Sequence, residues 1–298
     1  MLRIGVGLPT LETGTTGRFL VDWARLADAG PFSSLTVRDR VVDAAKEPLI
    51  ALATAAGVTT RIHLEANVII GPTRETTLLA RQAASIDALS GGRLTMGLGV
   101  GYRQDDYLAT GFPFHERVAR LDAQLPVLRR LWSGEPAGPG LGPVGPAPAR
   151  PGGPELLIGG HVPAVAARIA RWGDGYLASV GGDERDQARM LALWALIPQA
   201  WSAAGRPGTP RLVTGAYFAL GPAAEQEADR YLHANYGFKP GVAERMRRTV
   251  PTTPAAVARK IREQADLGAD EFILLSCVED ITALRALTNV LKAEGLDR

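Results

Sequence analysis

The sequence contains one cysteine and four histidines, and this scarcity excludes two kinds of site. A lone cysteine, Cys277, cannot form an intrachain disulfide, which is compatible with a cytoplasmic protein. Because Cys277 ends an apolar run and a nucleophile needs a neighbouring base, we expect a buried thiol rather than a catalytic one. No metal site is predicted, because the histidines have no paired spacing with cysteine or acidic residues; they are His63, His115, His161 and His233.

An excess of charge of either sign is also missing, as is any long apolar run. The 33 basic and 31 acidic residues leave a net charge of +2, which offers no general electrostatic basis for binding nucleic acid or a membrane surface. No apolar run reaches the ~18 residues of a transmembrane helix. Residues 1–6 are typical of a strand and not of a signal peptide. We therefore expect a cytoplasmic protein with no nucleic-acid or membrane partner.

The sequence does contain a regular alternation of short β-rich runs with longer helical patterns. Eight strands, each followed by helix, predict a parallel sheet, and eight such units can close into an α/β fold of the (β/α)8 TIM-barrel type. Strands are predicted at 2–8, 34–37, 63–70, 94–98, 156–159, 175–179, 212–220 and 271–276. Helices are predicted at 19–29, 48–56, 74–89, 117–132, 163–172, 185–204, 224–248 (interrupted near Gly237 and Pro240), 254–267 and 281–296.

The same alternation also occurs in doubly wound open sheets, which are the alternative fold. An open sheet of that kind normally places a glycine-rich fingerprint directly after its first strand. Here Gly5 and Gly7 are followed by Pro9 and not by a helix-opening glycine. The first strand therefore favours the barrel.

A Gly/Pro-rich stretch at about 133–154 breaks the alternation. Such a stretch is either a long loop or insertion, or a linker between domains. Because the alternation resumes at once with the same period, we interpret it as a loop within a single barrel domain spanning residues 1–298. The length also suits one barrel of ~250 residues with insertions.

The most informative segment is 89–102, which contains two groups of glycines. Gly91 and Gly92 turn the chain from a helix into the fourth strand, and Gly97, Gly99 and Gly101 allow a close backbone approach along that strand and its end. The alternative is a dinucleotide-binding loop, but the glycine spacing does not match and no helix follows directly. Neither a phosphate-binding loop of the Walker type nor a hydrolase nucleophile elbow is present.

Segment 89–102 resembles the corresponding region of the bacterial-luciferase-like family of flavin and deazaflavin oxidoreductases. Further segments resemble the same family in the same order, so that the resemblance covers nearly the whole chain; they are 79–87, 105–117, 158–164, 170–176 and 251–261. The resemblance implies a barrel that binds its cofactor at the carboxyl ends of the strands, where this fold places its active sites.

The resemblance places the cofactor phosphate at the turn Gly159-Gly160. Exposed N–H groups at a helix start bind anions, and glycine lets a phosphate come close. His161, Val162, Ser179 and Val180 would complete this site. For His161 a phosphate contact, an ordinary loop position and a catalytic role all remain open.

The resemblance places the cofactor ring beside Asp39 and against the strand at Asn67-Val68. Members of the family often have a non-proline cis peptide bond there, although an ordinary trans strand is the alternative. Gly99, Gly101 and Tyr102 would complete the ring site.

The candidate catalytic residues are Asp39, Arg40, Tyr102 and Asp105. Deazaflavin-dependent members often carry histidine where this chain has Arg40. A guanidinium is a poor proton donor but a good partner for a carboxylate, so we expect Arg40, with Arg74 and Arg103, to bind an anionic substrate. A surface Asp-Arg turn at 39–40 and a solvated loop at 102–105 are the structural alternatives.

The resemblance implies hydride transfer between the deazaflavin F420 and a small, anionic organic substrate. The compact chain favours F420, as does an Ala-, Arg- and Gly-rich composition that suits actinobacteria. One alternative is an FMN-dependent monooxygenase supplied with reduced flavin by a separate reductase. A second alternative is a non-catalytic flavin-binding barrel. A homodimer is common in the family and is expected here.

Overall fold

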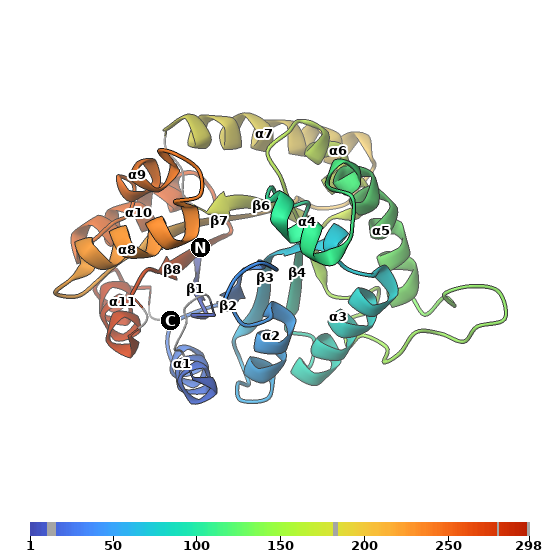
Figure 1. Ribbon diagram of the computed structural model, residues 1–298, viewed down its shortest axis with the longest axis horizontal. Helices are drawn as coiled ribbons and strands as arrows, with labels where there is room; N and C mark the ends of the chain where they lie inside the picture. Colours follow the sequence, from blue (N-terminus) through green and yellow to red (C-terminus); the bar gives the residue numbers. More distant parts are fainter. Residues whose placement is uncertain (11–15, 181–183, 279, 297–298) are drawn as a thin grey trace.

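The protein is a closed barrel of eight parallel strands in the order β1 to β8 (Figure 1). A computed structural model describes residues 1–10, 16–180, 184–278 and 280–296. Because β8 pairs with β1, the barrel has no free edge, and the alternative of an open sheet is wrong. The strands are β1 Arg3–Gly7, β2 Ser34–Val37, β3 His63–Ile70, β4 Leu94–Gly99, β5 Glu155–Gly159, β6 Gly175–Val180, β7 Arg211–Phe218 and β8 Glu271–Ser276.

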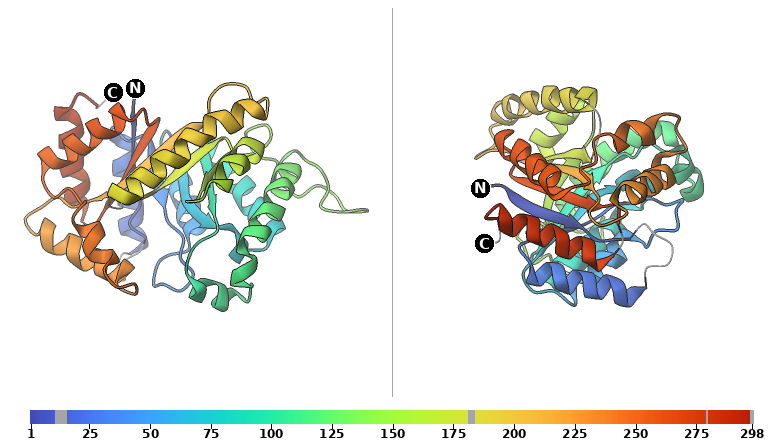
Figure 2. Two further views of the ribbon diagram at one scale, coloured as in Figure 1. Left: turned by 90° about the horizontal axis from the view of Figure 1, so that it is seen from above. Right: turned by 90° about the vertical axis from the view of Figure 1, so that its left-hand side faces the viewer.

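Helices surround the barrel, as both views in Figure 2 show. Helix α1 buries an apolar stripe formed by Leu20, Trp23, Ala24 and Ala27, which explains why this segment packs on the strands. The helices are α1 Gly17–Ala29, α2 Pro48–Ala56, α3 Thr76–Ser90, α4 Gln104–Thr110, α5 Arg117–Trp132, α6 Ala164–Trp172, α7 Glu184–Ala203, α8 Ala224–Tyr236, α9 Val242–Arg247, α10 Pro254–Asp266 and α11 Ile281–Ala293, with two 3-10 turns, η1 Gly71–Thr73 and η2 Phe114–Glu116. None of these helices, over the described residues, is both long and apolar enough to cross a membrane.

One helical region, 104–110, differs from the sequence prediction, whereas the interruption predicted near Gly237 and Pro240 is confirmed. Helix α4 lies where only loop residues were expected. The sequence did not predict it because a seven-residue helix is too short to show a clear apolar period. The long pattern at 224–248 is two helices, α8 and α9, separated by the segment that contains Gly237 and Pro240. Both regions lie at the carboxyl end of the barrel and contribute to its pocket.

Strands β3 and β4 approach each other unusually closely at Gly97. A Cβ at this position would lie 2.1 Å from the carbonyl oxygen of Ala66, so only glycine fits. The pairing of the two strands shifts register between Ala66 and Ile69, and the Asn67-Val68 peptide bond within this bulge is cis. The predicted cis bond is confirmed.

The Gly/Pro-rich stretch links α5 to β5 and projects from the body of the protein (Figures 1 and 2). None of residues 133–152 is buried, and the only β-type pairing described within the stretch is an isolated bridge between Pro136 and Pro143. The stretch therefore connects neighbouring elements of the same barrel.

A network of buried charges fills the amino-terminal end of the barrel. The guanidinium of Arg211 pairs with the carboxylates of Glu155 and Glu271, and it lies 3.9 Å from that of Glu65. Ser34 donates a hydrogen bond of 2.6 Å to Glu271. Burial raises the pKa of Glu65 well above its ordinary value, and the charge of Glu271 adds to this effect. Ion pairs thus close this end of the barrel.

Arg93, in the segment that most resembles the family, also lies away from the barrel mouth. Its guanidinium donates hydrogen bonds to the carbonyl oxygens of Ile62, at 2.8 Å, and Thr59, at 3.0 Å. Gly91 precedes it with φ of 69°, a left-handed conformation that favours glycine. This part of the segment therefore joins α3 to β4 and has a structural role.

Candidate functional site

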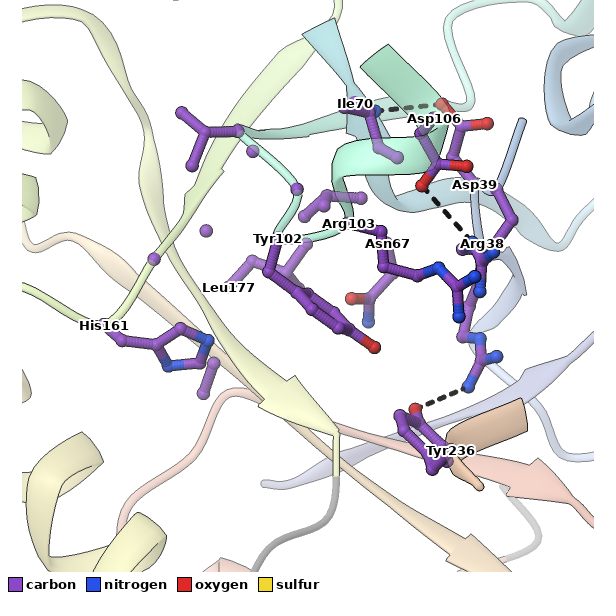
Figure 3. Close-up of a pocket in the computed structure, with 18 of the residues that line it drawn as sticks. Arg38, Asp39, Asn67, Ile70, Tyr102, Arg103, Asp106, His161, Leu177 and Tyr236 are labelled. Carbon is purple, nitrogen blue, oxygen red and sulfur yellow. Dashed lines mark hydrogen bonds and ion pairs between the residues drawn. The ribbon is translucent and has the colours of Figure 1, made fainter. Parts of the chain in front are cut away.

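A pocket of about 360 Å³ opens at the carboxyl ends of β2 to β6 (Figure 3). Its volume lies in the range of small-molecule sites, about 300–1,000 Å³. The segment from the end of α8 to the start of α9 closes one side. The lining residues are Arg38, Asp39, Arg40, Asn67, Val68, Ile70, Gly99, Val100, Gly101, Tyr102, Arg103, Asp106, Gly159, Gly160, His161, Leu177, Ala178, Tyr236, Phe238, Lys239 and Val242.

The floor of the pocket is the cis bond between Asn67 and Val68. Glycines leave room around it, because a Cβ at Gly99 or Gly159 would lie 2.8 or 3.0 Å from a methyl group of Val68. The side-chain amide nitrogen of Asn67, Nδ2, is buried and has no hydrogen-bond partner within the described part of the chain. A buried donor without a partner is unfavourable, and a heterocycle that carries acceptor atoms would satisfy it. The floor therefore fits a flat, hydrogen-bonding ring system.

Asp39 lines the pocket, and its carboxylate is fixed by hydrogen bonds from Ile70 and Arg74. It accepts a hydrogen bond from the backbone N–H of Ile70, at 2.9 Å, and both of its oxygens lie 3.1 Å from Arg74. Burial raises the pKa of the Asp39 carboxyl, although the charge of Arg74 opposes this shift. Arg74 also pairs with Glu47, at 2.7 Å, and does not itself line the pocket. Its charge is thus already matched by two carboxylates.

Asp106, which the sequence did not single out, fixes the loop after β2. One of its oxygens accepts the N–H groups of Val41, at 3.0 Å, and Val42, at 2.9 Å, and the other lies 3.3 Å from Nε of Arg40. Arg40 therefore lines the pocket as half of an ion pair. Helix α4 buries Asp106, but seven residues are too few for the sequence to show which face of the helix is buried.

Asp105 does not line the pocket but pairs with Arg103 at its rim. The hydrogen bond from Arg103 lowers the pKa of the Asp105 carboxyl. An ionised carboxylate has no proton to give, so this position is poorly suited to a general acid.

Tyr102 and Phe238 form an aromatic wall. Their rings stack with centroids 6.1 Å apart and planes inclined by 22°, and Arg103 lies 4.0 Å from the Phe238 centroid. Burial raises the pKa of the Tyr102 hydroxyl, which therefore keeps its proton at neutral pH. Phe238 follows β7 by twenty residues, and the only trace in the sequence was the helix break near Gly237.

Arg38, which was not among the predicted site residues, lines the pocket. Nη1 donates to the Tyr236 hydroxyl at 3.1 Å, Nη2 donates to the Asn235 amide oxygen at 3.4 Å, and the guanidinium lies 5.3 Å from the Tyr217 ring centroid. Burial opposes its charge most strongly, yet the neighbouring tyrosines, above all Tyr236, leave the pKa of Arg38 above its ordinary value. Arg38 is therefore a fixed positive charge.

The turn Gly159-Gly160-His161 lies on the other side of the pocket from Arg38 (Figure 3). The carbonyl oxygen of Gly160 accepts a hydrogen bond from the Tyr176 hydroxyl at 3.0 Å, and α6 begins four residues later. Burial lowers the pKa of His161, which favours a neutral ring. Val162 is exposed and does not line the pocket. The side chains of Ser179 and Val180, at the end of β6, lie outside the described part of the structure.

A family model described as luciferase-like monooxygenase matches residues 3–277. The chain belongs to this family. Membership of the luciferase-like family accounts for the barrel. In a separate respect, the described residues contain no group of histidine, cysteine and acidic side chains that could hold a metal ion.

Among curated relatives, an uncharacterized protein of Mycobacterium tuberculosis is 30% identical over 176 residues, which are 56% of this chain and 60% of that protein. An F420-dependent glucose-6-phosphate dehydrogenase of Mycobacterium avium is 32% identical over 206 residues, which are 62% of this chain and 60% of that enzyme. The chain thus spans about 60% of the length of these relatives.

Two solved structures share the fold over nearly their whole length. The monooxygenase RslO1 from Streptomyces bottropensis superposes with a TM-score of 0.81 at 22% identity, covering 99% of this chain and 100% of that one. An F420-dependent secondary alcohol dehydrogenase, in complex with an F420–acetone adduct, gives 0.78 at 15% identity and covers 98% of each chain. At these identities the likeness shows the luciferase-like barrel alone.

Proposed function

We propose that this protein is an F420-dependent oxidoreductase that transfers a hydride between the deazaflavin and a small organic substrate. The observation that carries the proposal is the floor of the pocket, where the buried Asn67 amide has no partner and glycines clear the space around Val68. The choice of F420 is supported by relatives named as F420-dependent dehydrogenases from Mycobacterium avium and Rhodococcus jostii.

The residues present would hold such a cofactor at two places. Asn67, Val68 and Gly99 would contact the ring, with Asp39 beside it. Gly159, Gly160 and His161 would contact its phosphate, because they lie just ahead of α6 and backbone N–H groups at a helix start attract anions.

When bound, the deazaflavin supplies hydride transfer at C5 of its ring. The protein must then supply or accept one proton at the substrate. Tyr102 is placed for this task, because its hydroxyl is protonated and points across the pocket toward Arg38 and Tyr236 (Figure 3). The residue is 60% exposed, so solvent can restore its proton. Asp39, whose pKa is raised by burial, is the second candidate.

An FMN-dependent monooxygenase is the second candidate function. It is favoured by the family description and by the monooxygenase RslO1, which superposes over the whole chain. That activity would need a partner reductase to deliver reduced flavin.

Titration of the purified protein with F420, FMN and reduced FMN tests the proposal. Micromolar binding of F420 with weaker binding of both flavins is the expected result. Tight binding of reduced FMN with oxygen consumption would support the monooxygenase instead. Binding of none of the three would indicate a non-catalytic barrel.

Substitution of Gly160 tests the phosphate turn within that proposal. A Cβ at Gly160 would lie 2.5 Å from a methyl group of Val165, so Gly160→Ala and Gly160→Asp share one steric conflict and differ in charge. We expect Gly160→Asp to bind F420 at least about tenfold more weakly than Gly160→Ala, since a carboxylate would face the phosphate. Equal affinities of the two variants for F420 would contradict the assignment of the cofactor phosphate to this turn.

A further inference from the structure

The four arginines around the pocket differ in how their charges are matched. Arg40 pairs with Asp106, Arg74 with Asp39 and Glu47, and Arg103 with Asp105. Arg38 has no carboxylate partner among the described residues; its hydrogen-bond acceptors there are a tyrosine hydroxyl and a side-chain amide. Arg40, Arg74 and Arg103 were predicted to bind an anionic substrate, but their charges are already neutralised by carboxylates of the protein. The charge of Arg38 is not neutralised in this way.

The surroundings of Arg38 offer its charge hydrogen bonds and ring faces but no opposite charge. Its guanidinium packs near the rings of Tyr217 and Tyr236, at 5.3 and 5.9 Å from their centroids. Ring faces and neutral acceptors solvate a cation only in part, and a charge withdrawn from water is stabilised fully by an opposite charge with good hydrogen-bond geometry. Because Arg38 lines the pocket, a bound ligand can supply that charge.

We propose that Arg38 binds a carboxylate of the substrate, which fixes the substrate at the end of the pocket opposite the Gly159-Gly160 turn. This inference rests on the proposed function, because it names the class of molecule that would share the pocket with the cofactor. A guanidinium binds a carboxylate through two parallel hydrogen bonds, a geometry that neither a hydroxyl nor an amide can match. Lys239, a pocket residue with no ion pair among the described residues, adds a further positive charge to the pocket lining.

The remaining walls indicate the rest of the ligand. The stacked pair Tyr102–Phe238 is 60% and 47% exposed, respectively, so it offers aromatic surface to a molecule in the pocket. Val242 continues the apolar surface. A planar or aromatic group that carries a carboxylate would contact this wall and reach Arg38 together. The substrate class is thus a small aromatic or unsaturated carboxylic acid.

Position separates this site from the predicted phosphate site. Figure 3 shows His161 at one side of the pocket and Arg38 with Tyr236 at the other, with Tyr102 between them. One anionic group at each end would leave the middle of the pocket, above Asn67, for the reacting ring and substrate carbon.

Calorimetric titration with three probes tests the assignment: benzoate, the neutral isostere benzamide and inorganic phosphate. The proteins are wild type, Arg38→Met, Arg38→Lys and Arg18→Gln, each with and without F420. Arg18→Gln is the charge-matched control, because that side chain is 91% exposed on α1. We expect wild type and Arg18→Gln to bind benzoate more tightly than benzamide. Arg38→Met should lose about thirtyfold or more in benzoate affinity, with benzamide unchanged, and Arg38→Lys should fall between them.

Three results would overturn the inference. The first is equal affinity of wild type for benzoate and benzamide, or of Arg38→Met and wild type for benzoate. The second is phosphate binding that is tighter than benzoate binding and equally dependent on Arg38, which would replace the carboxylate with a phosphate ester. The third is a loss of F420 affinity in Arg38→Met as large as the loss of benzoate affinity, which would assign Arg38 to the cofactor.

The same titrations separate this inference from the proposed function. If wild type binds benzoate through Arg38 but does not bind F420, the function fails and the anion site stands. If wild type binds F420 but does not bind benzoate, the anion site fails and the proposed function stands.

Discussion

The two ends of the barrel treat a buried arginine in opposite ways. At the amino-terminal end, Arg211 pairs with Glu155 and Glu271 and lies near Glu65. At the carboxyl end, the hydrogen-bond partners of Arg38 among the described residues are all neutral. A charge matched inside the protein holds strands together, whereas a charge left unmatched beside a pocket favours an anionic ligand. The pairing state of the arginines thus distinguishes the structural end from the binding end.

The ends also differ in what fills them. Carboxylates, guanidinium and serine hydroxyls occupy the amino-terminal end, with Ser33 and Ser34 both donating to Glu271. At the carboxyl end, Gly99 and Gly159 leave space above Val68. Substitutions at the first end should therefore change stability, and substitutions at the second should change ligand affinity.

Arg211→Met should give the largest effect. It leaves the buried Glu271 and the half-buried Glu155 without their common counter-ion, and breaking a buried pair costs about 3–5 kcal/mol. Denaturant unfolding would measure the loss. The matched control is Arg3→Met, since Arg3 is 46% exposed and lies 3.8 Å from Glu271, and it should cost less than about 1 kcal/mol. Similar losses for both variants would contradict the role given to Arg211.

Gly99→Ala should weaken F420 binding about tenfold, a change of about 1.4 kcal/mol. The added methyl would lie 2.8 Å from a methyl of Val68 and must displace the pocket floor. Fluorescence titration of F420 measures the change. Gly142→Ala is the control, because nothing lies within 4 Å of its Cβ position. Unchanged F420 affinity in Gly99→Ala would show that the cofactor does not contact this floor.

Glu65→Gln should alter how stability depends on pH. Burial raises the pKa of Glu65 above 4.5, so the folded state binds this proton more tightly than the unfolded state. Wild-type stability should therefore fall as pH rises from about 4.5 through the pKa of the folded state. The glutamine variant lacks this titration and should be more stable at pH 8 by on the order of 1 kcal/mol. Unfolding at pH 5 and pH 8 tests this, and an equal pH dependence in both proteins would contradict it.

Shortening the projecting loop should have the smallest effect. None of residues 138–143 is buried, and Ala137 and Val144, which pack against the hydrophobic core, lie outside this segment. Loop-closure entropy changes slowly with length. Replacement of this segment by two glycines should change the unfolding free energy by less than about 1 kcal/mol and leave F420 affinity unaltered. A large loss of affinity would show that the loop belongs to the binding end.

The strands were readily predicted, and the pocket only in part. Strands β2, β3 and β8 have the predicted bounds, because compact β-rich runs between turn residues need no tertiary information. The resemblance to the luciferase-like family led to the cis bond at Asn67-Val68 and to Asp39. The sequence analysis named Asp105 but not Asp106, because the helix α4 is too short to show in the sequence which of its residues are buried.

Sequence order by itself determined that eight βα units alternate and that glycines cluster at the ends of β4 and β5, since period and residue type are local properties. Only the tertiary structure decided which charges are matched. Arg38 meets Tyr236 across 198 positions of chain, and Arg211 meets Glu155 across 56. Closure of the barrel creates these neighbours, and no local pattern records them.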